Sequence, residues 1–214
     1  MKQKKQLRRL VLAAFFAAIE VVLVLTPIGI IPVGPVRATT MHIPVILAGI
    51  LCGPGFGAGI GAVFGLLSLA KNTFEPTITS FVFSPFITVG GIHGNFWSLL
   101  IVLGPRILMG AMSGWLSSFL HRHIKQKALS DCIASAVSAI THTLLVMGGI
   151  WVFFGQPYAS AQNLTVEAAG AVILAVIGTN GVVEMILAAV IVPILAKALK
   201  PAAVRMGVTD GAEQ

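Results

Sequence analysis

The stretch HIPVILAGILCGPGFGAGIGAVFGLLSLA, residues 42–70, decides how many times this chain crosses a membrane. It is apolar throughout and is interrupted near its centre by Pro54, which has a glycine on each side. A membrane-spanning helix needs about 20 residues, so the stretch is either one overlong helix or two short ones. The proline and its glycines favour a break, and the distribution of charge supports the same choice.

The composition of the whole chain is that of an integral membrane protein. Of its 214 residues, 57% are hydrophobic and only 10% are charged, whereas soluble domains average about 25% charged residues. The apolar runs are continuous and do not alternate with polar residues, which favours helices over a transmembrane β-barrel. The basic residues gather at the ends of these runs, so the net charge of +7 indicates topology and not nucleic-acid binding.

Charge at the ends of the runs selects six spans with both termini in the cytoplasm. Six spans place eleven lysines and arginines inside and two outside, whereas five spans would leave six inside and seven outside. Membrane proteins concentrate these residues on the cytoplasmic side. We therefore predict an all-α integral membrane protein, a compact six-transmembrane-helix bundle that forms one membrane domain over residues 1–214. The predicted spans lie near residues 10–31, 43–53, 56–70, 98–120, 131–154 and 168–196.

Three loops then face outside, and their composition predicts that they are structured. Residues 26–42 contain three prolines and two glycines, residues 71–97 are long and partly apolar, and residues 155–167 are polar. Long structured loops in compact proteins are usually lids or binding loops. Because the central loop is too apolar to float in water, we expect it to fold back over the bundle. The sequence thus predicts a small cavity that opens outward beneath the first two loops.

Two sets of small residues predict close contacts between helices. Gly57, Gly61 and Gly65 recur every four residues, so they line one helix face and permit close approach of a neighbouring helix. The stretch AAFFAA, residues 13–18, contains two overlapping pairs of alanines near the cytoplasmic end of the first span. Each pair predicts either ordinary packing inside the bundle or a contact with a partner.

Glu20 indicates which of these alanines face outward. A carboxylate within a span should face the protein interior. At about 100° per residue, Glu20 shares the helix face of Ala13 and Ala17. Ala14 and Ala18 then point away from the bundle, and the smooth stripe that they form suits docking onto a partner helix.

Arg106 and Glu184 are ionisable side chains deep within predicted spans, and Asn180 lies one turn before Glu184 on the same face. Charges within a membrane usually mark substrate or ion pathways, and arginine can hold a carboxylate or phosphate through two parallel hydrogen bonds. The alternative is an internal ion pair of Arg106 with Glu184 or Glu20. Pro105 lacks a backbone N–H, so it frees a carbonyl one turn earlier as a further acceptor if that side of the helix faces inward.

The sequence carries no recognisable catalytic or metal-binding set. His142 continues a polar stripe on the fifth span that is expected to face inward, and no metal-ligand spacing joins it to His42 or to another histidine. There is no HExxH or GxSxG motif, no paired-aspartate motif and no phosphate-binding loop. We therefore predict neither enzyme activity nor a cofactor, and any ATP-driven motor must be another chain.

Several motifs together resemble the substrate-binding S components of energy-coupling factor (ECF) vitamin transporters. The resemblance covers nearly the whole chain and is most specific within residues 42–68. HIPVI and SFVFSPF look most like the pantothenate-specific members. The motifs are the alanine pairs of the first span, residues 42–68, SFVFSPF at 80–86, PRILMG at 105–110, and the pair Asn180 and Glu184.

The resemblance implies a transport subunit of the bacterial cytoplasmic membrane. S components bind a vitamin from outside, associate with the membrane coupling subunit EcfT and its two cytoplasmic ATPases, and deliver the vitamin by toppling in the bilayer. The family's alanine motif contacts the coupling subunit, and here it maps onto Ala13 with Ala17 or Ala14 with Ala18. The family's pocket lies beneath the outer loops and between the fourth to sixth spans. It maps onto Thr39, Thr40, His42, Asn72, Arg106, His142 and Asn180, with Glu184 as the neighbouring carboxylate.

The predicted polar groups suit pantothenate, which carries a carboxylate, hydroxyl groups and an amide. One cation with neutral donors and acceptors fits such a ligand better than it fits a cationic vitamin such as thiamine. Pyridoxine or another small vitamin is an alternative ligand. A stand-alone proton-coupled carrier that uses Glu20, Glu184 and His142 is an alternative of another class, although the inverted repeats that would support it are not evident.

Overall fold

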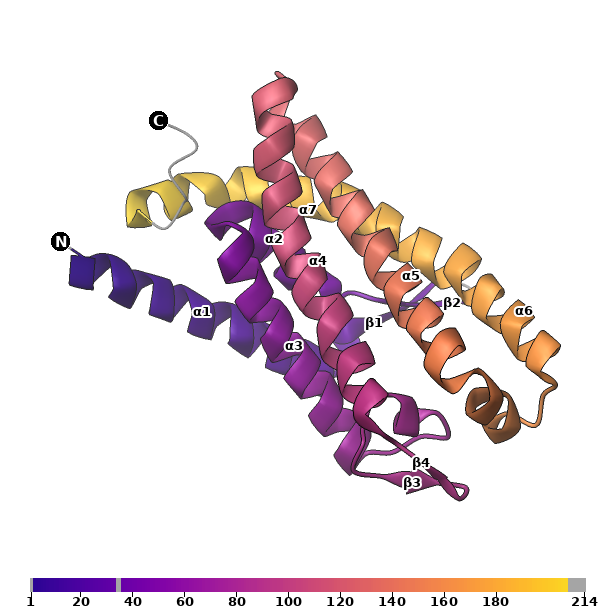
Figure 1. Cartoon of the computed structure of the whole chain (residues 1–214). Coiled ribbons are helices and arrows are strands. Elements are labelled where there is room, and N and C mark those ends of the chain that lie inside the picture. Colours follow the sequence, from indigo (N-terminus) through magenta and orange to yellow (C-terminus); the bar gives the residue numbers. More distant parts are fainter. Residues whose placement is uncertain (1, 34–35, 208–214) are drawn as a thin grey trace.

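The computed structural model describes residues 2–33 and 36–207 and shows a bundle of long helices with short strands in its loops (Figure 1). The mainly helical architecture confirms the predicted class. A π-helical turn, η3 (Ile177–Gly181), continues α6 directly into α7. The helices are α1 (Lys2–Leu25), α2 (His42–Cys52), α3 (Pro54–Phe74), α4 (Phe96–His123), α5 (Lys127–Ala161), α6 (Val166–Val176) and α7 (Val182–Met206).

The predicted break within residues 42–70 lies between α2 and α3. Gly53 adopts a φ of 91° there, and Pro54 is the first residue of α3. Glycine reaches positive φ without steric penalty, and proline is favoured at a first helical position because its missing N–H would have no partner. The short helix α2 is buried on nearly all sides, as expected of a helix that is apolar all round.

Two of the loops contain strands that an all-α prediction does not include. The first loop forms a 3-10 turn, η1 (Pro27–Gly29), and an antiparallel hairpin of β1 (Ile30–Val33) and β2 (Val36–Thr39). The second loop forms a 3-10 turn, η2 (Ser80–Val82), and a small hairpin of β3 (Thr88–Val89) and β4 (Ile92–His93). Each hairpin pairs backbone groups of its loop with one another.

The ends of two helices differ from the predicted spans. Helix α1 ends at Leu25 because Pro27 starts a 3-10 turn, so the predicted extension to residue 31 is wrong. Helix α5 continues to Ala161 with Pro157 inside it, so most of the predicted third loop is helical. The connection between α5 and α6 is therefore only residues 162–165.

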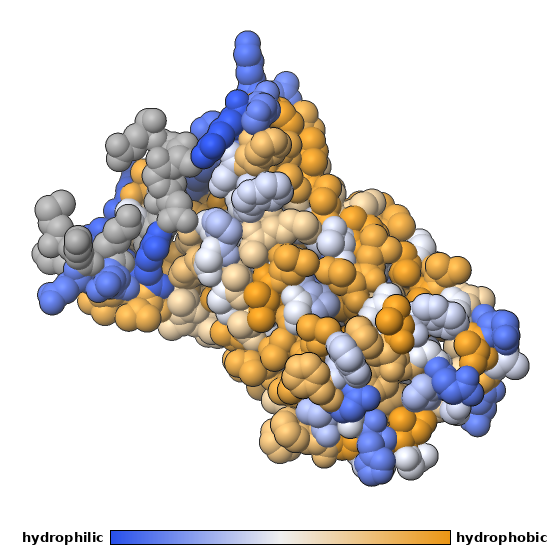
Figure 2. Space-filling model, viewed as in Figure 1, coloured by the Kyte–Doolittle hydropathy of each residue, from blue (hydrophilic) through white to orange (hydrophobic). Residues whose placement is uncertain are grey.

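The surface of the molecule has the polarity of a membrane protein. Four helical segments within the described residues are long and apolar enough to cross a bilayer, namely α3, α4, α5 and the continuous α6–α7. Figure 2 shows hydrophobic side chains over the middle of the molecule, with hydrophilic ones gathered toward opposite ends. The start of α1 and the end of α7 lie toward one end, and the β3–β4 hairpin lies at the other (Figure 1). This arrangement is that of a multi-pass membrane protein.

The predicted glycine stripe brings α3 and α4 into direct backbone contact. A Cβ added at Gly61 would collide with the carbonyl oxygen of Arg106, and one added at Gly57 would collide with that of Gly110. Gly65 faces the backbone of α4 one turn further along. Small residues on both helices therefore set the position of the backbone that carries Arg106.

Candidate functional site

A cavity of about 290 Å³ lies where α3, α4, α5 and η3–α7 meet residues from the first two loops. Its volume is near the lower end of the range of about 300–1,000 Å³ that is usual for small-molecule sites. Its walls combine aromatic and aliphatic side chains with a few polar groups. The lining residues are Thr39, Met41, Phe64, Ser68, Phe83, Arg106, His142, Thr143, Val146, Met147, Val176, Asn180 and Glu184.

Arg106 is the buried cation of this cavity, with a relative exposure of 7%. Its Nη1 donates a hydrogen bond of 2.9 Å to the carbonyl oxygen of Ile101. That carbonyl is available because the residue that would bond to it in the helix is Pro105, which has no N–H. A second contact of 3.5 Å joins Nη2 to Ser68 Oγ on α3. The proline thus supplies an acceptor that orients the arginine beside it.

Two aromatic rings flank the guanidinium group. The Arg106 Cζ atom lies 5.3 Å from the ring centre of Phe64 on α3 and 5.6 Å from that of Phe83. Phe83 follows η2, so the loop between α3 and α4 contributes directly to the site. Cations within about 6 Å of a ring centre are attracted by the negative ring face. The rings therefore stabilise the charge without neutralising it.

No ion pair among residues 2–33 and 36–207 joins Arg106 to a carboxylate, so the pair with Glu184 or Glu20 that the sequence left as an alternative is absent there. The Arg106 Nε atom is buried and has no hydrogen-bond partner within the same residues. A buried charge that lacks a counter-charge is costly. The site is therefore electrostatically suited to an anionic group of a ligand.

Glu184 is instead engaged by the first loop. Its Oε1 accepts hydrogen bonds from the backbone N–H of Thr39 at 3.0 Å and from Thr39 Oγ1 at 2.8 Å. Thr143 Oγ1 on α5 lies 3.5 Å from the other carboxylate oxygen. The end of β2 is thereby attached to the start of α7.

His142 and Asn180 line the cavity from α5 and η3. His142 Nε2 is buried without a hydrogen-bond partner in the described residues, and its ring centre lies 6.4 Å from that of Phe64. Asn180 lies within the π-helical turn, and such turns occur frequently at functional sites. Both side chains can exchange hydrogen bonds with the hydroxyl or amide groups of a ligand.

Three of the residues proposed from the sequence do not line the cavity. Thr40 Oγ1 donates to the carbonyl of Ile28 at 3.3 Å, which holds the first loop together. The Nε2 of His42 lies 3.2 Å from the backbone carbonyl of Glu184, so this histidine supports α7 from α2. Asn72 accepts a hydrogen bond of 2.7 Å from Ser80 and thereby attaches η2 to α3. These three residues support the loops and α7 around the cavity.

The sequence reasoning missed the aromatic and hydroxyl side chains around Arg106. Ser68 and Phe64 belong to the specific motif at residues 42–68, and Phe83 is the central phenylalanine of SFVFSPF. Neither motif shows by itself that its residues meet the arginine of another helix. Thr143 directly follows His142, and nothing in the sequence indicated that it also lines the cavity.

The predicted orientation of α1 is confirmed. Glu20 is fully buried, and both its carboxylate oxygens lack a hydrogen-bond partner within the described residues. Ala14 and Ala18 are exposed, whereas Ala13 and Ala17 are half-buried. The exposed pair lies within an apolar face of α1 that the rest of the bundle leaves uncovered. This face continues with Leu10, Val21 and Leu25.

The fold and the cavity together define a class, a helical membrane protein with a small, partly polar cavity beside a buried arginine. The model of the family described as "ECF transporter, substrate-specific component" matches residues 8–196. The chain belongs to this family, which is a transporter component and not an enzyme family.

Two curated relatives match nearly the whole chain. The pantothenic acid transporter PanT of Lactococcus lactis subsp. cremoris is 37% identical over 205 residues, which cover 92% of this chain and 98% of the relative. The pantothenate transporter PanT of Leuconostoc mesenteroides subsp. mesenteroides is 30% identical over 216 residues, covering 93% and 95%.

A solved structure has the same fold. It is the S-component for biotin from an ECF-type ABC transporter, with a TM-score of 0.52 and 18% sequence identity, and the match covers 92% of this chain and 95% of that one. At this identity the likeness concerns the fold alone.

Proposed function

We propose that this chain is the pantothenate-binding subunit of an ATP-driven importer in the bacterial cytoplasmic membrane. The observation that carries the proposal is Arg106, a buried cation with no carboxylate partner among the described residues, at the wall of a small cavity. Membership of the family supports it, as do the two pantothenate transporters that match over nearly the whole chain.

The polar groups of the cavity match those of pantothenate in kind. The carboxylate of the vitamin would bind the guanidinium of Arg106, since charged partners with parallel donors form the strongest hydrogen bonds. Its hydroxyl and amide groups would form hydrogen bonds with the side chains of Asn180 and His142. They would also donate to the carboxylate of Glu184. Met41, Phe64 and Val146 would contact its aliphatic part.

The proposed topology has six spans with both termini in the cytoplasm. It adds α1 and α2 to the four apolar segments described above. The basic residues near the start of α1, around residues 122–127 and near the end of α7 then lie inside. The cavity and its loops face outside, where the vitamin is captured.

The same proposal assigns a partner to α1. Ala14 and Ala18 would dock onto the membrane coupling subunit EcfT, which two cytoplasmic ATPases drive, and the chain would topple to release its vitamin inward. The exposure of this alanine pair supports the assignment, because small residues let two helices approach closely.

Calorimetry with the purified full-length chain tests the proposal. We expect pantothenate to bind tightly and pantothenol, in which a hydroxymethyl group replaces the carboxylate, to bind much more weakly. Tight binding of pyridoxine or another neutral vitamin without binding of pantothenate would overturn the substrate assignment.

A stand-alone proton-coupled carrier is the second candidate function, and Glu20 is the observation that favours it. A buried carboxyl group without a hydrogen-bond partner in the described residues can carry a proton within a membrane. Uptake into vesicles that contain this chain alone separates the two functions. Accumulation driven by a proton gradient, with no ATPase present, would contradict the subunit proposal.

A further inference from the structure

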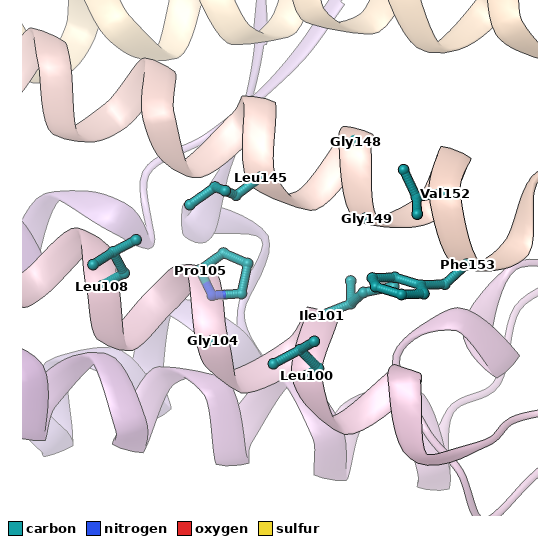
Figure 3. A pocket seen from close by; sticks show the side chains of 10 residues that line it. All are labelled: Leu100, Ile101, Gly104, Pro105, Leu108, Leu145, Gly148, Gly149, Val152 and Phe153. Atoms are coloured by element: carbon teal, nitrogen blue, oxygen red, sulfur yellow. The ribbon is translucent and has the colours of Figure 1, made fainter.

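A second and larger hollow, a groove of about 440 Å³, runs between α4 and α5 (Figure 3). Leu100, Gly104 and Leu108 line it from α4. At about 100° per residue, Gly104 and Arg106 lie on opposite sides of α4, so the groove is separate from the cavity that holds the arginine. From α5 the wall includes Leu145, Gly148 and Val152.

Glycines create the space. A Cβ added at Gly148 would meet no atom within 4 Å, and one added at Gly104 would meet only a terminal carbon of Leu100 at 3.6 Å. The gap between the two helices is therefore open at Gly104 and Gly148, whereas at Gly149 a Cβ would lie 3.0 Å from a side-chain carbon of Ile101 and the helices are close. Side chains project into it from both helices in Figure 3.

The chemistry of the groove matches hydrocarbon. Every residue that lines it is apolar, and both helices that form it are long and apolar enough to cross a bilayer. Its rim therefore faces lipid. An empty groove there would forfeit the dispersion contacts of its lining atoms, and no polar side chain on its walls would hold water.

The shape of the rim favours a flexible chain over a helix. Leu100, Leu108, Leu145 and Val152 stand at its edges with relative exposures of 46%, 47%, 40% and 71%. A helix with its side chains is about 10–12 Å wide, and close docking of helices needs small residues at the contact. These large side chains would hold a helix away from the glycine floor, whereas a single methylene chain can pass between them.

The depth of the groove also matches part of a lipid tail. Trp97 stacks on Phe153 at one end, with ring centres 4.1 Å apart, and tryptophan is enriched at the membrane–water interface. From Leu100 to Leu108 the groove descends about 12 Å along α4 at 1.5 Å per residue. We propose that this groove binds one acyl chain of an outer-leaflet phospholipid. The choice of the outer leaflet rests on the topology given under the proposed function, whereas the groove itself does not depend on that topology.

Photo-crosslinking tests the proposal with the full-length chain in nanodiscs of phosphatidylglycerol that contains a diazirine on one acyl chain. We expect labelling to concentrate in residues 100–108 and 145–153. A Cβ at Gly148 meets nothing within 4 Å, so Gly148→Leu places its side chain in the open groove. It should lower this labelling about tenfold, the loss expected when two buried methylene groups are displaced. Gly104→Leu fills it from the other wall and serves as a second variant.

Gly59→Leu is the matched control, because Gly59 is exposed on α3 and a Cβ there meets nothing within 4 Å. It should leave the labelling of the groove unchanged. Equal labelling in all variants, or labelling spread evenly over the exposed helix faces, would overturn the proposal. Pantothenate binding, measured on the same samples, reports on the proposed function independently.

Discussion

At the scale of single residues, the groups that contact Arg106 are polar or aromatic but uncharged. The carbonyl of Ile101 and the rings of Phe64 and Phe83 stabilise its charge, and none of them cancels it. Within the described residues the charge has no acidic partner. The geometry therefore leaves the strongest electrostatic interaction of the site to a ligand.

Replacing this arginine should remove that interaction. We expect Arg106→Gln to weaken pantothenate binding by about 2 kcal/mol or more, roughly 30-fold, as removal of one partner from a buried charge pair does. Calorimetry on the purified variant measures the change. Arg122→Gln, at the exposed end of the same helix, is the control and should bind normally. Unchanged affinity in a folded Arg106→Gln protein would contradict the anchoring role.

At the scale of elements, two contacts hold the site together. The first is the backbone packing of α3 on α4, which Gly61 permits directly beneath Arg106. The second is the attachment of the β1–β2 hairpin to α7, which Thr39 and Glu184 make. Each contact leads to a separate prediction, because one positions the arginine and the other positions the loop above it.

Gly61→Ala should separate the two helices at the arginine. Its new Cβ would collide with a backbone oxygen of α4 that cannot rotate away, and overpacking of this kind costs about 1–3 kcal/mol. We expect a lower unfolding temperature and weaker pantothenate binding in a thermal-shift assay. Gly59→Ala lies in open space on the same helix and should change neither. Equal stability of the two variants would show that the helices do not need this contact.

Thr39→Val should loosen the hairpin while leaving the arginine in place. It removes the hydroxyl bond to Glu184 and keeps the backbone one, and bonds to charged groups contribute about 1.5–3 kcal/mol. We expect pantothenate to dissociate at least about tenfold faster, measured by stopped flow. Thr26→Val is the control, because Thr26 lies in the same loop and its hydroxyl bonds to the carbonyl of Val22 at the end of α1. An unchanged dissociation rate would mean that this bond does not retain the ligand.

The elements also show what the sequence could predict. The break at Pro54 and the glycine face of α3 follow from local chemistry, so both were predicted correctly. The position of Arg106 at a cavity wall followed from the cost of a charge in lipid. The hydrogen-bond partner of Glu184 could not be predicted, because Thr39 is 145 positions away in the sequence and lies in a loop. The strands of that loop were missed because its prolines and glycines predict turns as readily as a hairpin.

At the scale of the whole molecule, the cavity proposed to bind the vitamin and the face proposed to dock the partner are different surfaces. The cavity lies among α3, α4, α5 and α7, whereas the exposed alanines lie on α1. Of the residues that line the cavity, none comes from α1. A change on the outer face of α1 can therefore disturb a partner without reaching the ligand.

This separation gives the prediction that tests the proposed role of α1. Ala14→Trp and Ala18→Trp place a large ring where a partner helix must approach closely, so we expect each to prevent co-purification with the coupling subunit and its ATPases. Pantothenate affinity, measured by calorimetry, should stay unchanged, because Glu20 keeps its buried position on the opposite face. Leu174→Trp on α6, where Leu174 is 70% exposed, is the control and should still assemble. A full complex that forms with both alanine variants would move the docking surface away from α1, and a loss of vitamin binding in them would show that the two surfaces are coupled after all.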